Sequence, residues 1–75
     1  MSNVTYKIIV KSNAGGFYAS SLEAQIQGSS ANGVQKYNGE HDLFFITFPE
    51  ENAQYADELL VADDNVISFS EVAGE

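Results

Sequence analysis

The sequence predicts an α+β fold in which two helices cover one face of a four-stranded antiparallel sheet. Three observations predict it. Apolar residues alternate with other residues near both ends of the chain, at 4–12 and 66–72, as they do in strands. An Asn-Gly pair at 38–39 separates two further strand-like segments and is the strongest short signal of a β-hairpin. A helical repeat of apolar residues occupies 50–62.

The first strand, 4–12, has two distinct faces. Val4, Tyr6, Ile8 and Val10 share one of them, and Thr5, Lys7, Ile9 and Lys11 share the other. The segment 13–16 contains two glycines, which tolerate positive φ and end the strand. We therefore expect a chain reversal directly after residue 12.

Residues 17–28 fit two interpretations. The spacing Ser20-x-x-Glu23 matches a capping box, and Gly28 is a suitable residue to follow a helix. These signals favour a helix. The same residues also alternate as a strand would, and the fold would then be a sheet of about five strands with a single helix at 50–62.

The middle of the chain predicts a loop at 28–33 and a hairpin of strands 34–37 and 42–48 around the turn 38–41. The run Leu43–Ile46 is apolar on both faces, so strand 42–48 is expected in the centre of the sheet.

Pro49 is expected at the first position of the helix 50–62, followed by Glu50 and Glu51 where the helix dipole favours negative charge. Leu59 and Leu60 belong to its apolar stripe. Residues 63–65 end this helix, and strand 66–72 follows with Val66, Ser68, Ser70 and Val72 on one face.

The resulting order β-α-β-β-α-β is that of a small ferredoxin-like sandwich. At 75 residues the chain is expected to form one domain, 1–75, with residues 73–75 as a frayed tail. Because an architecture of this kind hosts many activities, it predicts no function by itself.

Composition excludes several classes of protein. Cysteine is absent, so disulfides and thiolate zinc sites are excluded. The apolar runs are far shorter than the roughly 18 residues of a membrane span, and the N-terminus does not resemble a signal peptide. We expect a cytoplasmic protein that binds no membrane and no cofactor.

Charge is distributed unevenly along the chain. Residues 1–39 carry a net charge of +2, whereas residues 40–75 contain ten carboxylates and no Lys or Arg, which gives the total of −8. A negative domain repels nucleic-acid phosphates and attracts basic protein surfaces. Direct nucleic-acid binding is therefore not expected.

The sequence contains no catalytic signature. The single histidine, His41, lies between Glu40 and Asp42 in a predicted turn, where a solvated histidine explains the pattern better than a base or metal ligand does. Asp63, Asp64 and Asn65 offer oxygen ligands but lack the spacing of a calcium loop. The prediction is a protein that is not an enzyme and binds no metal.

Acidic residues near the second helix are the best candidates for binding a partner. Asp57 and Glu58 follow Glu50 and Glu51 by seven positions, which predicts a stripe of like charge on one helix face. Tyr37 and Tyr55 are candidate interface anchors. The predicted partner-binding residues are Asp57, Glu58, Asp63, Asp64, Glu50, Glu51 and Tyr55.

The leading hypothesis is a non-enzymatic module that binds a basic surface on a larger protein. In this hypothesis it is a viral or mobile-element accessory protein, and its phosphate-like acidic face inhibits a host complex that handles nucleic acid. A structural or decoration subunit that docks by strand pairing through 4–12 or 66–72 is the first alternative. A ferredoxin-like domain that senses a small molecule is the second, and a homodimer is compatible with all three.

Overall fold

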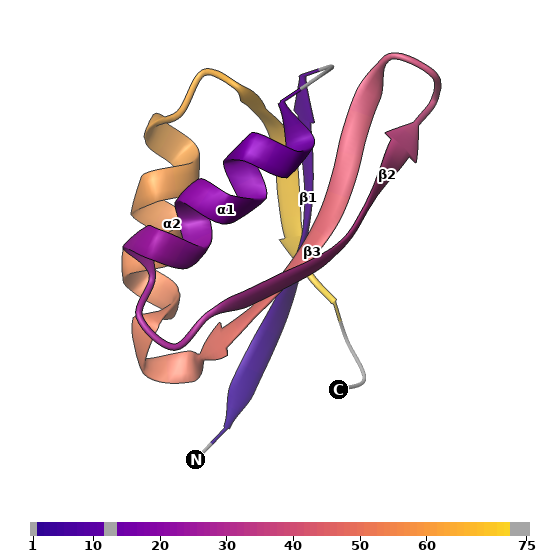
Figure 1. Ribbon diagram of the computed structural model, residues 1–75. Coiled ribbons are helices and arrows are strands. Elements are labelled where there is room, and N and C mark those ends of the chain that lie inside the picture. The colour runs from indigo at the N-terminus through magenta and orange to yellow at the C-terminus, as the bar shows by residue number, and fades with distance from the viewer. Residues whose placement is uncertain (1, 12–13, 73–75) are drawn as a thin grey trace.

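The structure is a computed structural model that describes residues 2–11 and 14–72. Its elements in chain order are β1 (Asn3–Lys11), α1 (Gly15–Gln25), β2 (Ser30–Tyr37), β3 (His41–Pro49), the 3₁₀ turn η1 (Glu50–Asn52), α2 (Ala53–Ala62) and β4 (Val66–Glu71). Figure 1 shows both helices on the same face of the sheet.

The four strands pair antiparallel in the order β2-β3-β1-β4. With two helices on one face, this is the predicted ferredoxin-like α+β sandwich. The alternative with five strands and one helix is excluded, because residues 15–25 form α1. β1 and β3 lie in the middle of the sheet, so β2 and β4 are its outer strands.

The core lies between the helices and one face of the two middle strands. Tyr6, Ile8 and Val10 share one face of β1 as predicted, and the structure shows that this face is turned to the helices. The other buried residues of this core are Phe44, Ile46 and Phe48 of β3, Tyr18, Ala19 and Leu22 of α1, Ile26 just after it, and Ala56 and Leu60 of α2. Burial of large apolar side chains from all these elements is the main term that stabilises the fold.

The start of α1 differs from the prediction. The helix begins at Gly15, so Ser20 lies inside it and is exposed, and the predicted capping box is wrong. Ala14 precedes the helix and makes no side-chain capping bond. A carboxylate from a remote strand takes that role instead, because Oδ2 of Asp42 accepts a hydrogen bond from the Gly15 N–H at 3.0 Å.

β2 is longer than predicted. Residues 30–32, expected in a loop, pair with β3, and an irregularity between Asn32 and Gln35 interrupts the ladder. Gly33 lies in it with φ +72°. The predicted tight turn is confirmed, since Asn38 and Gly39 have φ values of 65° and 77°.

The predicted helix 50–62 is divided into η1 and α2. Pro49 is the last residue of β3 and has an extended conformation, so it is not the first helical residue. The side-chain amide of Asn52 donates a hydrogen bond to the Gln27 carbonyl at 2.8 Å, which fixes η1 against the end of α1. Leu60 is buried and Leu59 is half-buried, in agreement with the predicted apolar stripe.

β4 pairs with β1 through a register shift. Val66 lies opposite Val10, whereas Ser68 lies opposite Ile9. Val66 and Ser68 therefore lie on different faces of the sheet, and the prediction that they share a face is wrong. The predicted frayed tail, 73–75, lies outside the described residues. Within the described part of the chain, neither helix has the length and apolar composition needed to cross a membrane.

Candidate protein-binding surfaces

The helical layer, which we define as residues 14–29 and 50–65, contains acidic residues and no Lys or Arg. Its seven carboxylates are Glu23, Glu50, Glu51, Asp57, Glu58, Asp63 and Asp64. The three lysines of the chain all lie in strands of the sheet, at Lys7, Lys11 and Lys36. The helical layer therefore carries charge of one sign, whereas the sheet and its hairpin turn carry the lysines together with Glu40, Asp42 and Glu71.

Asp57 has a structural partner inside the fold. Its Oδ1 accepts a hydrogen bond of 2.7 Å from the hydroxyl of Tyr6, a residue of β1 that is 7% exposed. Burial, together with this hydrogen bond and the negative charge of Asp57, raises the pKa of Tyr6 to about 12. The Tyr6 ring also stacks on Phe69, so this contact connects α2, β1 and β4.

Asp63 also has contacts within the fold. It follows α2, and its Oδ1 accepts a hydrogen bond from the Asn65 N–H at 2.8 Å, which forms the turn into β4. Burial, and then the neighbouring Asp63 carboxylate, raise the pKa of Tyr18. Of the seven predicted binding residues, Asp57 is thus hydrogen-bonded to a buried tyrosine, and Asp63 is hydrogen-bonded within the turn into β4.

Glu50 and Glu51 lie in η1, ahead of α2, and both are exposed. The Glu50 N–H donates to the Ser2 carbonyl at 3.0 Å, which attaches η1 to the start of the chain. Ser2, Pro49, Glu50 and Glu51 line a shallow depression. Both side chains remain available to a partner at this end of the molecule.

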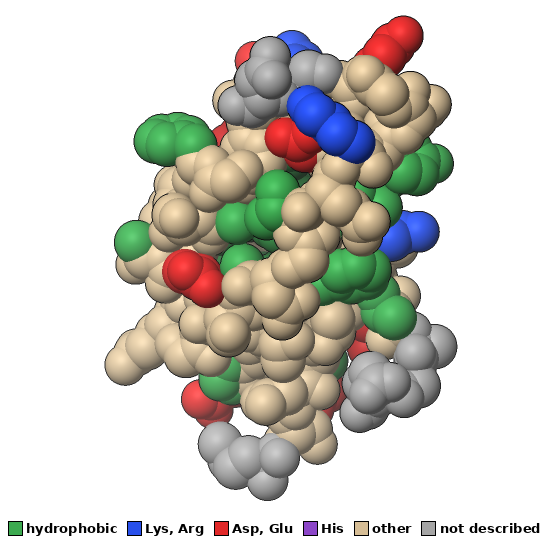
Figure 2. Space-filling model, turned by 45° about the vertical axis from the view of Figure 1, so that its right-hand side comes forward, with side chains coloured by type: hydrophobic (Ala, Val, Ile, Leu, Met, Phe, Trp, Pro, Cys, Tyr) green, Lys and Arg blue, Asp and Glu red, His purple; other side chains and the backbone are tan. Residues whose placement is uncertain are grey.

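The remaining predicted residues are exposed on or after α2. Glu58 and Asp64 are exposed, and Tyr55 is 49% exposed. Because Asp57 bonds to Tyr6 whereas Glu58 faces solvent, the predicted single stripe of like charge is not formed. On the face drawn in Figure 2, red carboxylates are separated by uncharged surface.

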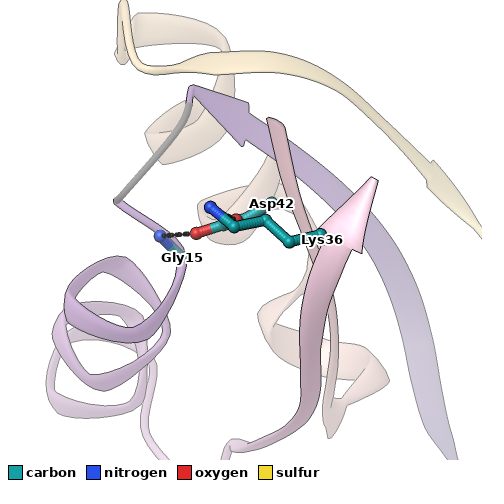
Figure 3. Close-up of polar contacts among 3 residues, drawn as sticks. All are labelled: Gly15, Lys36 and Asp42. Carbon is teal, nitrogen blue, oxygen red and sulfur yellow. Dashed lines mark hydrogen bonds and ion pairs between the residues drawn. The ribbon is translucent and has the colours of Figure 1, made fainter. Parts of the chain in front are cut away.

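A buried carboxylate joins α1 to the hairpin of β2 and β3. Figure 3 shows Asp42 between the start of α1 and Lys36. Asp42 is 7% exposed, and its Oδ1 lies 3.2 Å from the Lys36 ammonium. The Gly15 N–H, and then Lys36, hold the pKa of the Asp42 carboxyl below its usual value. Since both of its oxygens are occupied, Asp42 positions the helix rather than binding a ligand.

His41 begins β3 opposite Lys11 and Tyr37, on the face of the sheet that the helices do not cover. Its Nδ1 is shielded from solvent and has no hydrogen-bond partner among the described residues. Within 2–11 and 14–72, no three His, Cys, Asp or Glu side chains come together as a metal site would require.

The two outer strands differ in their contacts, and sequence reasoning did not detect this difference. On β2, the N–H of Ala31 donates to the Glu23 carboxylate of α1 at 2.6 Å. Lys36 points to the helix-covered face, where it pairs with Asp42. β4 carries neither kind of contact among the described residues. β1, one of the two segments proposed for strand pairing, has neighbours on both sides and has no edge to offer.

No family model matches this chain, and neither the curated proteins nor the solved structures include a significant match to it.

Proposed function

We propose that the protein is a non-enzymatic protein-binding module whose helical layer docks on a basic surface of a larger partner. The observation that supports this proposal is the charge of one sign in the helical layer, which has seven carboxylates and no Lys or Arg. A surface of one sign attracts a partner of the opposite sign over distances of about a Debye length, and it accelerates association.

Four of these carboxylates are assigned to the partner: Glu50, Glu51, Glu58 and Asp64, all exposed. Asp57 and Asp63 are assigned to the fold instead, because Asp57 accepts a hydrogen bond from Tyr6 and Asp63 accepts one from the Asn65 N–H. Tyr55, half-exposed on α2, supplies an aromatic anchor beside the charges.

The partner chemistry that fits this surface is a protein patch that otherwise contacts nucleic-acid phosphates. In this proposal the protein acts in the cytoplasm as an accessory inhibitor, viral or encoded by a mobile element, of a nucleic-acid-handling complex. A short DNA duplex and the protein then compete for the same site on the partner.

Salt dependence tests the proposal on a partner that is first captured from cells and then purified. Raising salt from about 50 to 500 mM should weaken the complex strongly, because the charges are screened. A labelled DNA duplex bound to the partner should be released by the protein. A complex that is insensitive to salt, or that forms without displacing the duplex, would contradict the proposal.

Charge-neutral variants locate the surface. Replacing Glu58 by Gln and Asp64 by Asn should weaken binding and reduce its salt dependence. The matched control is Glu40→Gln in the hairpin turn, compared with Glu58→Gln alone, because each variant removes one exposed carboxylate. Equal effects of these two single variants would mean that only net charge matters, and the assigned surface would be wrong.

A second function, assembly by strand pairing, is favoured by the outer position of β4. Of the two segments predicted for such pairing, 66–72 contains an outer strand, whereas 4–12 contains the interior strand β1.

A further inference from the structure

The outer edge of β4 presents backbone groups that β1 does not use. The Val72 N–H donates to the Thr5 carbonyl at 2.8 Å, so residue 72 points its backbone groups toward β1. Because successive residues of a strand point their N–H and C=O groups to opposite sides, Ser70 and Ser68 also face β1. The N–H and C=O groups of Phe69 and Glu71 therefore face outward.

This edge has fewer of the features that prevent strand addition than β2 has. Outer strands are commonly protected by lysine, proline, bulges or inward-pointing charges. β2 has an inward-pointing Lys36, an irregular register at Gly33 and an N–H covered by Glu23. β4, with the sequence VISFSE, has no lysine or proline. Its one register shift lies near its beginning, and its one charge, Glu71, is at its last residue, so the middle of the strand has neither.

We propose that β4 pairs with β4 of a second copy of this chain, antiparallel about a two-fold axis, so that two sheets join into one of eight strands. The contact is isologous: each copy contributes the same edge and receives the same edge. Backbone hydrogen bonds through the outward groups of Phe69 and Glu71 hold the two strands together.

The charge of Glu71 selects the register. Centring the axis on Glu71 would place two carboxylates directly opposite each other, and centring it on Ser70 would place them at neighbouring positions. Centring it on Phe69 separates the carboxylates and brings the two phenyl rings together on the helix-covered face, where Phe69 stacks on Tyr6. In this register Ser68 lies opposite Ser70 of the second copy.

A second copy suits this edge better than an unrelated strand does, because it leaves no unprotected strand edge exposed. Pairing of β4 with β4 covers the unprotected edge of both copies at once. The ends of the joined sheet are then the two β2 strands, which carry their own protection. A foreign strand would in general bring a new open edge with it.

Charge makes this dimer dependent on salt. Each copy carries −8, and a two-fold axis perpendicular to the sheet places both acidic helical layers on the same side. Screening therefore strengthens the dimer, whereas it weakens the complex with a basic partner described above. The two proposals predict opposite responses to salt and fail independently.

Cysteine pairs test both the dimer and its register, since the chain has no native cysteine. Ser68 and Ser70 are exposed, so Ser68→Cys and Ser70→Cys should leave the fold intact. Opposite residues of this kind lie about 4.5 Å apart between Cα atoms, close enough for a disulfide. Under oxidation at about 0.5 M salt, a mixture of the two variants should cross-link at least about tenfold faster than either variant alone.

Each outcome decides the proposal. Fast cross-linking of the mixture, with a molecular mass near twice 8.1 kDa for the unmodified protein at high concentration, supports it. Fast cross-linking of Ser70→Cys alone would move the axis to Ser70 and overturn the register. A monomer at every concentration and salt, with all three samples equally slow, would overturn self-pairing and leave the edge to a strand of a different protein.

Discussion

The two outer strands of this sheet both have unpaired backbone groups, and β2 is protected by more contacts than β4. β2 is connected to α1 by the Glu23–Ala31 hydrogen bond and to β3 by the Lys36–Asp42 ion pair. β4 is held by β1, and a backbone hydrogen bond lies just beyond each of its ends. The Lys11 N–H donates to the Asn65 carbonyl, and the Val72 N–H donates to the Thr5 carbonyl. β4 is therefore the less protected of the two edges, and such an edge in a small fold is a candidate for docking.

The largest expected effect comes from proline in β4. Ser70→Pro removes an N–H that faces β1 and should lower the free energy of unfolding by about 3 kcal/mol. Glu71→Pro removes an outward N–H and should cost the monomer much less, because outer strands tolerate proline at such positions. Urea denaturation measures both. Equal losses would contradict the assignment of which groups face outward.

Substitutions of the two glycines at the start of α1 test whether Asp42 of β3 constrains this helix. A Cβ added at Gly15 would lie 2.6 Å from Cβ of Asp42, whereas one added at Gly16 would have no neighbour within 4 Å. Gly15→Ala should destabilise the protein by about 1–3 kcal/mol, and Gly16→Ala should be neutral or stabilising by about 0.4–1 kcal/mol. Thermal unfolding of the two variants distinguishes them; similar stabilities would show that the Asp42 carboxylate does not constrain α1.

Tyr6 contacts Phe69 of β4 and Asp57 of α2, and the ionisation of its hydroxyl makes the stability of the fold depend on pH. Its pKa is raised in the folded protein to about 12 from the usual tyrosine value of about 10, so the unfolded chain loses this proton first. The stability that this difference provides is complete below pH 10 and is lost as the pH rises toward 12.

Tyr6→Phe should cost about 1 kcal/mol at neutral pH and should make the alkaline loss of stability smaller. The measurement is the free energy of unfolding between pH 8 and 12. Tyr18, whose pKa is also raised, remains in the variant and accounts for the rest of the alkaline loss. An unchanged pH profile would show that the Tyr6–Asp57 bond has no role in it.

The smallest effect concerns the protection of β2. Glu23→Ala removes the acceptor of the Ala31 N–H and should cost only about 0.5 kcal/mol, because the bond is exposed. Amide hydrogen exchange should nevertheless become faster at Ala31. The control is Gln25→Ala, whose side chain bonds only to Ser21 within α1. Faster exchange at Ala31 in the control would contradict the role given to Glu23.

Local sequence patterns predicted most of this fold. The alternation in 4–12 placed Tyr6, Ile8 and Val10 on one face of β1, and Asn38–Gly39 identified the hairpin, because in both cases neighbouring residues determine the structure. The beginning of β2 was missed because Ser30, Ala31 and Asn32 are small residues typical of loops, and three residues are too few for their alternation to indicate a strand.

Contacts between distant residues explain what the sequence could not predict. The group that caps α1 is Asp42, which lies 27 positions after Gly15. Asp57 looked like a surface charge next to Glu58, but its partner Tyr6 is 51 positions away. Helical periodicity places Asp57 on the polar side of α2, and only the packing of α2 on β1 shows that this position meets a tyrosine hydroxyl.

Amide hydrogen exchange as a function of protein concentration tests the comparison of the two edges most directly. At about 0.5 M salt, exchange at Phe69 and Glu71 should become slower as the concentration rises, since these amides become paired in the dimer. Exchange at Ala31 of β2 should not change. Slower exchange along β2, or no dependence on concentration at Phe69 and Glu71, would contradict the claim that β4 is the docking edge.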